Sequence, residues 1–437
     1  MVKKILSSSE LNINNQMINQ DAMYVIQKLQ ENGFDGYIVG GGIRDLLLNK
    51  KPKDFDIVTN ATPEAIRKIF KRNSILIGKR FKIVHVIFHH INYDKLINNR
   101  PITERHIIEI STYRSLKVNE SALNEFGRIM VDNNYGKQND DALRRDFTIN
   151  AIYYDPVKEV VVEYHGGIKD LNKNSLKMIG DPLKRYIEDP VRVLRAIRLS
   201  AKLGLSIEEN TLKGINSTKE LLINENRGRL FEEMLKILLS GTSEVCIDKI
   251  IQLQLPRGIF PLFDKVFFGK VKDPIALKIL AKTDERIQSN GDVSAVFILS
   301  GLLWSIINRQ WQKLLFNGSS PRQALCDAIQ LNRSYAANIG ITKNMFNAMT
   351  DVWMLQFEFE NPMYKKLLKI TSSPRFRQGL HLYNIRNELD EVDPKLNIWW
   401  NKFIALNTNE EKIAYIESFK KLFSSNSKIS KTKKKKK

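Results

Sequence analysis

Two aspartates separated by one residue are the clearest candidates for metal chemistry in this 437-residue sequence. Asp54 and Asp56 flank Phe55 in a segment with β-strand character. Side chains alternate faces along a strand, so the two carboxylates point the same way. Like charges at this separation repel unless a cation lies between them. Because hard oxygen ligands suit Mg²⁺ or Mn²⁺, the pair predicts a divalent-metal site.

A glycine run lies just upstream, where a predicted strand meets a predicted helix. Gly40, Gly41 and Gly42 follow Val39. Glycines at such a turn let backbone N–H groups approach phosphates. Arg44, in the first turn of the helix, can donate several hydrogen bonds to a triphosphate. Each motif alone is also typical of an ordinary turn, but together they predict a nucleotide site beside the metal.

A two-metal site calls for a third carboxylate, and the sequence offers two. Glu109 lies in an apolar strand, where it could equally be the exposed face of an edge strand. Asp146 follows Arg144 and Arg145, with either of which it could form a salt bridge. The sequence does not choose between these two residues.

The charge of the chain indicates a polyanionic partner. Lys and Arg number 69 against 48 Asp and Glu, a net charge of +21, and removing the seven lysines of residues 428–437 still leaves +14. A surplus spread over body and tail favours a polyanion as partner. An anionic membrane surface is the competing interpretation, but no amphipathic anchor accompanies the tail.

Features of other protein classes are missing from the sequence. Two cysteines support neither a disulfide framework nor a zinc site. The longest uncharged stretch, Val293–Ile307, is short for a bilayer crossing, so it predicts a buried helix and no stable membrane insertion. The N-terminus turns polar too early for a signal peptide. We therefore expect a cytoplasmic protein.

The pattern of strands and helices around these residues predicts an α+β fold. Short β-rich runs alternate with helices up to about residue 155, and helical periodicity dominates from about residue 180. The strand candidates are Tyr37–Val39, Phe55–Val58, Ile83–Phe88 and Ile107–Ile110, after a helix at Asp21–Leu29. The predicted parts are an N-terminal extension and helix (1–30), a catalytic head (31–160), a helical neck (161–250), an RNA-binding helical body (251–423) and a disordered Lys-rich tail (424–437).

Four ordered motifs resemble the class II nucleotidyltransferases, the family of bacterial poly(A) polymerases and tRNA CCA-adding enzymes. They are Gly41-Gly42-x-Arg44-Asp45, Asp54-x-Asp56, Arg144-Arg145-Asp146-Phe147-Thr148-x-Asn150-Ala151 and Glu188-Asp189-x-x-Arg192-x-x-Arg195-x-x-Arg198. The likeness covers roughly residues 36–205. Looser matches to the poly(A) branch reach about residue 400, although that branch usually has Arg where Lys79 and Lys82 stand.

The resemblance implies a small mixed-sheet head followed by helical neck and body domains. It implies that Asp54 and Asp56 bind metal and that Asp146 is the third carboxylate. The implied nucleotide-binding residues are Gly41, Arg44, Arg145, Asp189, Arg192, Arg195 and Arg198.

Asp189 and Arg192 could read the edge of the incoming base. A carboxylate accepts from an exocyclic amine, and Arg donates to the adjacent ring nitrogen. Adenine and cytosine present an exocyclic amine donor beside a ring-nitrogen acceptor, whereas guanine and uracil present an acceptor beside a donor. Alternatively, Asp189 is a helix N-cap before Pro190 and the arginines are a solvated stripe.

The predicted reaction is template-independent transfer of AMP from ATP to RNA 3′ ends, with Mg²⁺ or Mn²⁺ as cofactor and release of pyrophosphate. The alternatives are tRNA CCA addition and an inactive RNA-binding scaffold. Candidate RNA contacts are Arg375, Arg377, Lys433, Lys434 and Lys435.

Overall fold

A computed structural model describes residues 2–78, 82–97, 100–115, 134–269, 271–363, 367–406, 408 and 410–416. The chain forms two compact units, residues 1–222 and 223–437. The finer division into head, neck, body and tail stays a prediction, and the tail lies outside the described residues.

The first unit is built on a mixed sheet, as the family resemblance implies, and this sheet has eight strands. Its order is β1-β8-β7-β2-β3-β6-β5-β4, and among the strand pairs described within this sheet only β3 and β6 run parallel. The strands are β1 (Lys4–Ser7), β2 (Tyr37–Val39), β3 (Asp56–Thr59), β4 (Ser74–Ile77), β5 (Ile83–Ile97), β6 (Arg100–Thr112), β7 (Ile152–Asp155) and β8 (Val160–Glu163). A short parallel pair joins β9 (Ser175–Leu176) to β10 (Ser206–Ile207).

Helices of the first unit bury apolar stripes against this sheet and against one another. In α1 (Gln20–Glu31), Ala22, Val25, Ile26 and Leu29 recur at helical spacing and are fully buried. The other helices are α2 (Gly41–Leu47), α3 (Pro63–Phe70), α4 (Gln138–Arg144), α5 (Gly167–Asn172), α6 (Pro182–Glu188), α7 (Val191–Leu203) and α8 (Glu209–Thr218). Single 3₁₀ turns occur at Asn15–Met17, Lys71–Asn73 and Thr148–Asn150, and a longer one, Lys219–Asn224, crosses the boundary between the units.

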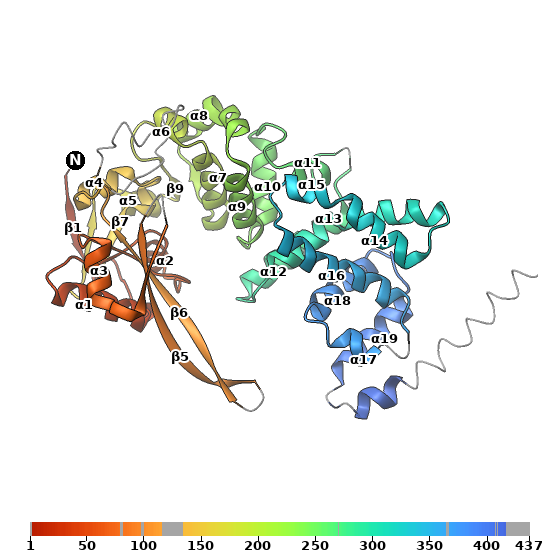
Figure 1. Ribbon diagram of the computed structural model, residues 1–437. Coiled ribbons are helices and arrows are strands. Elements are labelled where there is room, and N and C mark those ends of the chain that lie inside the picture. The colour runs from red at the N-terminus through yellow and green to blue at the C-terminus, as the bar shows by residue number, and fades with distance from the viewer. Residues whose placement is uncertain are drawn as a thin grey trace, which may run out of the picture. The chain divides into compact units, whose positions relative to one another are not determined.

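Strands β5 and β6 run well past the segments predicted for them. They form a two-stranded ribbon that projects from the sheet (Figure 1). The sequence predicted strands only at Ile83–Phe88 and Ile107–Ile110, because the residues beyond these segments lack continuous apolar alternation. Cross-strand pairing satisfies their backbone groups instead.

The second unit is helical in its described part, as predicted from periodicity. Its helices are α9 (Arg227–Leu238), α10 (Ser243–Gln252), α11 (Pro261–Val266), α12 (Pro274–Gln288), α13 (Ala295–Phe316), α14 (Pro321–Leu331), α15 (Arg333–Asn338), α16 (Lys343–Glu360), α17 (Leu367–Thr371), α18 (Phe376–Asn387) and α19 (Pro394–Ala405). Val293–Ile307 falls largely within α13, where Trp304 is fully buried. None of the described helices combines the length and apolarity that a bilayer crossing requires.

Candidate active site

The predicted strand–turn–helix is present around the glycine run. Strand β2 ends at Val39, Gly40 turns the chain with φ 70°, and α2 begins at Gly41. A positive φ favours glycine at position 40. At Gly42, an added Cβ would lie 3.0 Å from the Ile38 side chain and 3.4 Å from the Asp54 carbonyl oxygen. The glycines therefore let α2 pack closely against β2 and against the segment that carries the aspartates.

The two aspartates lie at the start of β3 and beside Glu109. Asp56 is the first residue of β3, and Asp54 lies two residues before it. Both are exposed whereas Phe55 is buried, so the predicted alternation of side chains is confirmed. Asp56 pairs with Glu109 in the parallel register of β3 and β6, although the two are distant in sequence.

Neighbouring carboxylates perturb Asp56. Desolvation by the surrounding protein atoms, repulsion from Glu109 and a smaller repulsion from Asp54 raise the pKa of Asp56 to about 6, against the opposing attraction of Arg145. The charges of Glu109 and Asp54 disfavour ionisation of Asp56, and a divalent cation bound by these carboxylate oxygens would relieve that repulsion. Asp54, Asp56 and Glu109 are thus residues that could hold Mg²⁺ or Mn²⁺.

We expect Mn²⁺ binding to this site to strengthen as the pH rises through about 6, the raised pKa of Asp56. The metal needs the ionised carboxylate, so affinity at pH 5 should be about tenfold lower than above pH 7. Calorimetric titration at several pH values measures this. Glu109→Gln removes a repulsive charge and should move the transition to lower pH. A transition that stays in place would show that Glu109 does not raise this pKa.

A cavity of about 430 Å³ opens beside Asp56 and is strongly basic. Its acids are Asp56, Asp146 and Asp189, which the cations outnumber. It is lined by Gly40, Gly41, Arg44, Asp56, Arg144, Arg145, Asp146, Asn150, Asp189, Arg192, Arg195, Arg198, Leu199 and Lys202. Every nucleotide-binding residue implied by the family resemblance lies in this lining. The arginine and lysine side chains of this lining form a basic wall, which suits a polyanion such as a nucleoside triphosphate.

Asp146 is engaged by neighbours. It is buried, and its Oδ2 lies 2.7 Å from Arg195 Nη2. Its Oδ1 accepts hydrogen bonds from the Phe147 N–H at 2.8 Å and from the Asn150 side-chain amide at 3.1 Å. Burial alone would raise the pKa of Asp146, but Arg195 and these two donors lower it. Asp146 thereby links the segment before β7 to helix α7.

Two arginines of the cavity are held in place by acids that are not in its lining. Arg44 donates to Asp45 Oδ1 from Nη2 at 2.7 Å and to Asn150 Oδ1 from Nη1 at 3.1 Å. Arg145 donates from Nε to Asp141 Oδ2 at 3.1 Å. Ion pairing of this kind fixes the direction of a guanidinium, so less entropy is lost when an anion binds.

Lys202 lines the cavity and Arg185 supports its lining, although no sequence motif pointed to either residue. Arg185 Nη2 donates to the carbonyl oxygens of Arg144 and Arg145 at 2.8 and 2.7 Å, which ties α6 to the basic wall. Lys202 lines the cavity one turn beyond Arg198 on α7. Lys202 lies four residues after Arg198, so the three-residue spacing of the arginines did not point to it.

Asp189 and Arg192 both line the cavity, at the junction of α6 and α7. Asp189 follows the last residue of α6, and α7 begins at Val191 with Pro190 as its N-cap residue. Asp189 therefore stands one residue outside the position of a capping side chain. Arg192 Nη1 donates to the Arg185 carbonyl at 2.7 Å.

The RNA-contact candidates lie in the second unit. Arg377, on α18, lines a cavity of about 1030 Å³ together with Lys282, Arg286 and Lys412. Arg375 is the N-cap residue of α18. Lys433, Lys434 and Lys435 lie outside the described residues, as does Lys79 in the first unit.

Comparison with known proteins places these features in a family. Residues 36–177 match the family described as "Poly A polymerase head domain", 204–267 the "Probable RNA and SrmB- binding site of polymerase A", and 317–437 the "Polymerase A arginine-rich C-terminus". The chain is 33% identical to poly(A) polymerase I of Haemophilus influenzae over 424 residues, which covers 92% of this chain and 88% of the relative. It is 34% identical to poly(A) polymerase I of Escherichia coli O6:H1 over 404 residues, with coverages of 90% and 83%.

CCA-adding enzymes are also similar, over less of the sequence. The enzyme of Lactobacillus helveticus is 33% identical over 238 residues, which covers 54% of each chain. Among solved structures, apo form II of a CCA-adding enzyme matches with a TM-score of 0.55 at 19% identity, covering 93% of this chain and 88% of that one. At that identity the structural match shows the fold alone.

Proposed function

This chain belongs to the poly(A) polymerase I family of class II nucleotidyltransferases, and we propose that it adds adenosines from ATP to RNA 3′ ends without a template. The observation that carries the proposal is the basic cavity with acids at its edge. Asp56, flanked by Asp54 and Glu109, can hold metal where the arginine-rich wall can hold a triphosphate.

The charges of the site residues suggest separate roles for the acids and the arginines. Mg²⁺ held by the acids would activate the RNA 3′-hydroxyl and neutralise charge on the triphosphate. Arg44 and Arg145, already oriented by Asp45 and Asp141, supply donors to the phosphates. Arg195 and Arg198 extend the same basic wall along α7.

We propose Glu109, rather than Asp146, as the third carboxylate. Glu109 is the register partner of Asp56 and acts on its pKa directly. Asp146 faces the cavity too, but Arg195 neutralises it and two hydrogen bonds hold its other oxygen. In this proposal, Asp146 positions α7 and its arginines.

Incubation of the protein with a generic RNA and each nucleoside triphosphate separately tests the activity. Long extension with ATP alone supports polyadenylation. Addition that needs CTP and stops after a few residues would instead make the chain a CCA-adding enzyme. Failure with every triphosphate in the presence of Mg²⁺ and Mn²⁺ would support the inactive scaffold.

We propose that Asp189 and Arg192 read the base edge, since both line the cavity. Asp189→Ala should then compress the ratio of kcat/KM for ATP to that for GTP by at least about tenfold, or roughly 1.4 kcal/mol. A capping residue would instead cost about 1 kcal/mol of stability and leave nucleotide preference unchanged. Kinetics with all four triphosphates and a melting temperature separate the two roles. An unchanged ATP-to-GTP ratio would remove Asp189 from base recognition.

We propose that RNA contacts Arg377 and the C-terminal lysines. Deleting residues 424–437 removes seven lysines and should weaken binding of single-stranded RNA at low salt. The slope of log K against log salt should flatten by roughly 0.7 for each RNA phosphate that the truncated chain no longer neutralises. Arg377→Ala should flatten it by about one such step. Fluorescence anisotropy over a salt series measures both, and unchanged low-salt affinity of the truncated chain would exclude the tail as an RNA-binding segment.

A further inference from the structure

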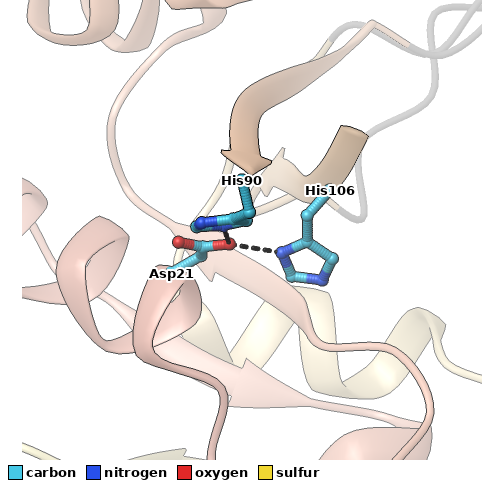
Figure 2. Close-up of side chains that lie close together, drawn as sticks. All are labelled: Asp21, His90 and His106. Carbon is cyan, nitrogen blue, oxygen red and sulfur yellow. Dashed lines mark hydrogen bonds and ion pairs between the residues drawn. The ribbon is translucent and has the colours of Figure 1, made fainter. Parts of the chain in front are cut away.

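Three potential metal ligands converge outside the basic cavity. Asp21 of α1, His90 of β5 and His106 of β6 have ligand atoms that all lie within 4.8 Å of one another. Figure 2 shows both imidazole rings directed at one carboxylate oxygen of Asp21. That oxygen, Oδ2, lies 2.7 Å from His90 Nε2 and 2.5 Å from His106 Nδ1.

All three residues lie on regular secondary structure, one on a helix and two on paired strands. In the register of β5 and β6, His90 is opposite Glu104, and His106 is opposite Phe88. His90 and His106 are therefore diagonal neighbours on one face of the ribbon. Asp21 lies in the first turn of α1, where its N–H donates to the Asn19 side chain at 2.7 Å.

The charge of Asp21 favours a cation at this point. Its side chain is only 8% exposed, and its ion-pair contacts among the described residues are with the two histidines. An imidazole carries positive charge only when it is protonated. A buried carboxylate without a full positive charge beside it is costly. A divalent cation would supply positive charge beside Asp21 and would accept the imidazole nitrogens as ligands.

We propose that Asp21, His90 and His106 form a binding site for Zn²⁺ or a similar transition-metal ion. Two imidazole nitrogens and one carboxylate oxygen are a donor set that such ions take, with water completing the shell. Ligand atoms around one tetrahedral ion lie roughly 3.3 Å apart, given metal–ligand distances near 2.0 Å. The present contacts are shorter, so the rings would move outward by less than about 1 Å. The His90 side chain is 56% exposed, which leaves room for this movement and a path for the ion.

The ion would join helix α1 to the ribbon. His106 precedes Glu109 by three residues on β6, so the junction also restrains the strand beside Asp56. The role is structural, and the site is separate from the carboxylates that could hold Mg²⁺. A direct hydrogen-bonded junction without metal is the alternative, and binding measurements distinguish the two.

Zn²⁺ titration of the full chain against a chromophoric chelator tests the site, with millimolar Mg²⁺ present to occupy the all-oxygen site. We expect one equivalent of Zn²⁺ to bind. Replacing a ligand should weaken binding by at least about tenfold in His90→Ala and His106→Ala, since loss of even an outer partner typically costs that much. His89→Ala is the matched control: His89 is exposed and adjacent, but its side chain points to the opposite face of the ribbon.

Melting temperatures supply a second readout. Zn²⁺ should raise the melting temperature of the unaltered chain and of His89→Ala, because a ligand that binds only the folded state stabilises it. It should not raise that of His90→Ala or Asp21→Asn, whatever their metal-free stability. Absence of stoichiometric binding to the unaltered chain, or equal losses in His89→Ala and His90→Ala, would overturn the proposal and leave a hydrogen-bonded junction.

Discussion

Replacing Asp54 or Asp56 with alanine is expected to lower the rate of AMP incorporation by about a thousandfold or more. A metal ion that stabilises charge on the reacting groups contributes several kcal/mol to the transition state. A thousandfold loss corresponds to roughly 4 kcal/mol. Single-turnover extension of a short RNA with ATP and Mg²⁺ measures the rate.

The same variants should bind RNA about as tightly as the unaltered chain does. The proposed RNA contacts are cations of the second unit, and removing one acid near the cavity takes none of them away. Both variants should also fold, because the two aspartates are exposed. Replacing Asp56 removes a carboxylate whose charged form its surroundings disfavour. Glu64→Ala, which removes an exposed acid on α3, is the matched control and should keep full activity. Near-normal turnover of either aspartate variant in Mg²⁺ would show that the metal assignment is wrong.

The parts of the site that the sequence predicted are those encoded within a few residues. Asp54 and Asp56 carry their chemistry and their geometry in a three-residue pattern, and the strand alternation proved correct. The glycine run was equally local, because a turn between β2 and α2 needs a residue that tolerates positive φ.

Relations between distant segments were not predictable in the same way. The choice between Glu109 and Asp146 depends on the parallel pairing of β3 with β6, which no local pattern encodes. Arg185 donates to two main-chain carbonyls. Because every residue has such a carbonyl, no residue type in the sequence indicates this contact. The cluster of Asp21 with His90 and His106 needs both α1 and a ribbon longer than its apolar residues predict.

The strands, like the site residues, were predictable only where the local sequence determines them. Four strands in β-rich, mostly apolar segments were predicted near their observed positions, whereas β1 falls in the stretch predicted to be an N-terminal extension. Strand β1 is an edge strand, and its residues are mostly exposed. Its position is set by backbone pairing with β8, which side-chain patterning does not reveal.

The third carboxylate can be identified by comparing Glu109→Gln with Asp146→Asn. Glutamine keeps the shape of Glu109 but loses the charge, so the rate of AMP incorporation should fall by about a hundredfold or more, on the order of 3 kcal/mol. Its melting temperature should hardly change, because the Glu109 side chain is 44% exposed and its ion pair with His85 is long, at 3.6 Å.

Asp146→Asn should act differently, through stability and ATP binding. The pKa of Asp146 is lowered in the folded chain, so its ionised form contributes stability that is present above its ordinary value of 3.8 and is lost as the pH falls through the lower folded value. Removing the charge leaves Arg195 without this carboxylate, at a cost of about 1–3 kcal/mol in the free energy of unfolding. That cost should be evident at pH 7 and should shrink toward pH 3. Because Arg195 would lose its fixed direction, KM for ATP should rise more than kcat falls. A stable, inactive Asp146→Asn protein beside a near-normal Glu109→Gln protein would restore Asp146 as the third metal ligand.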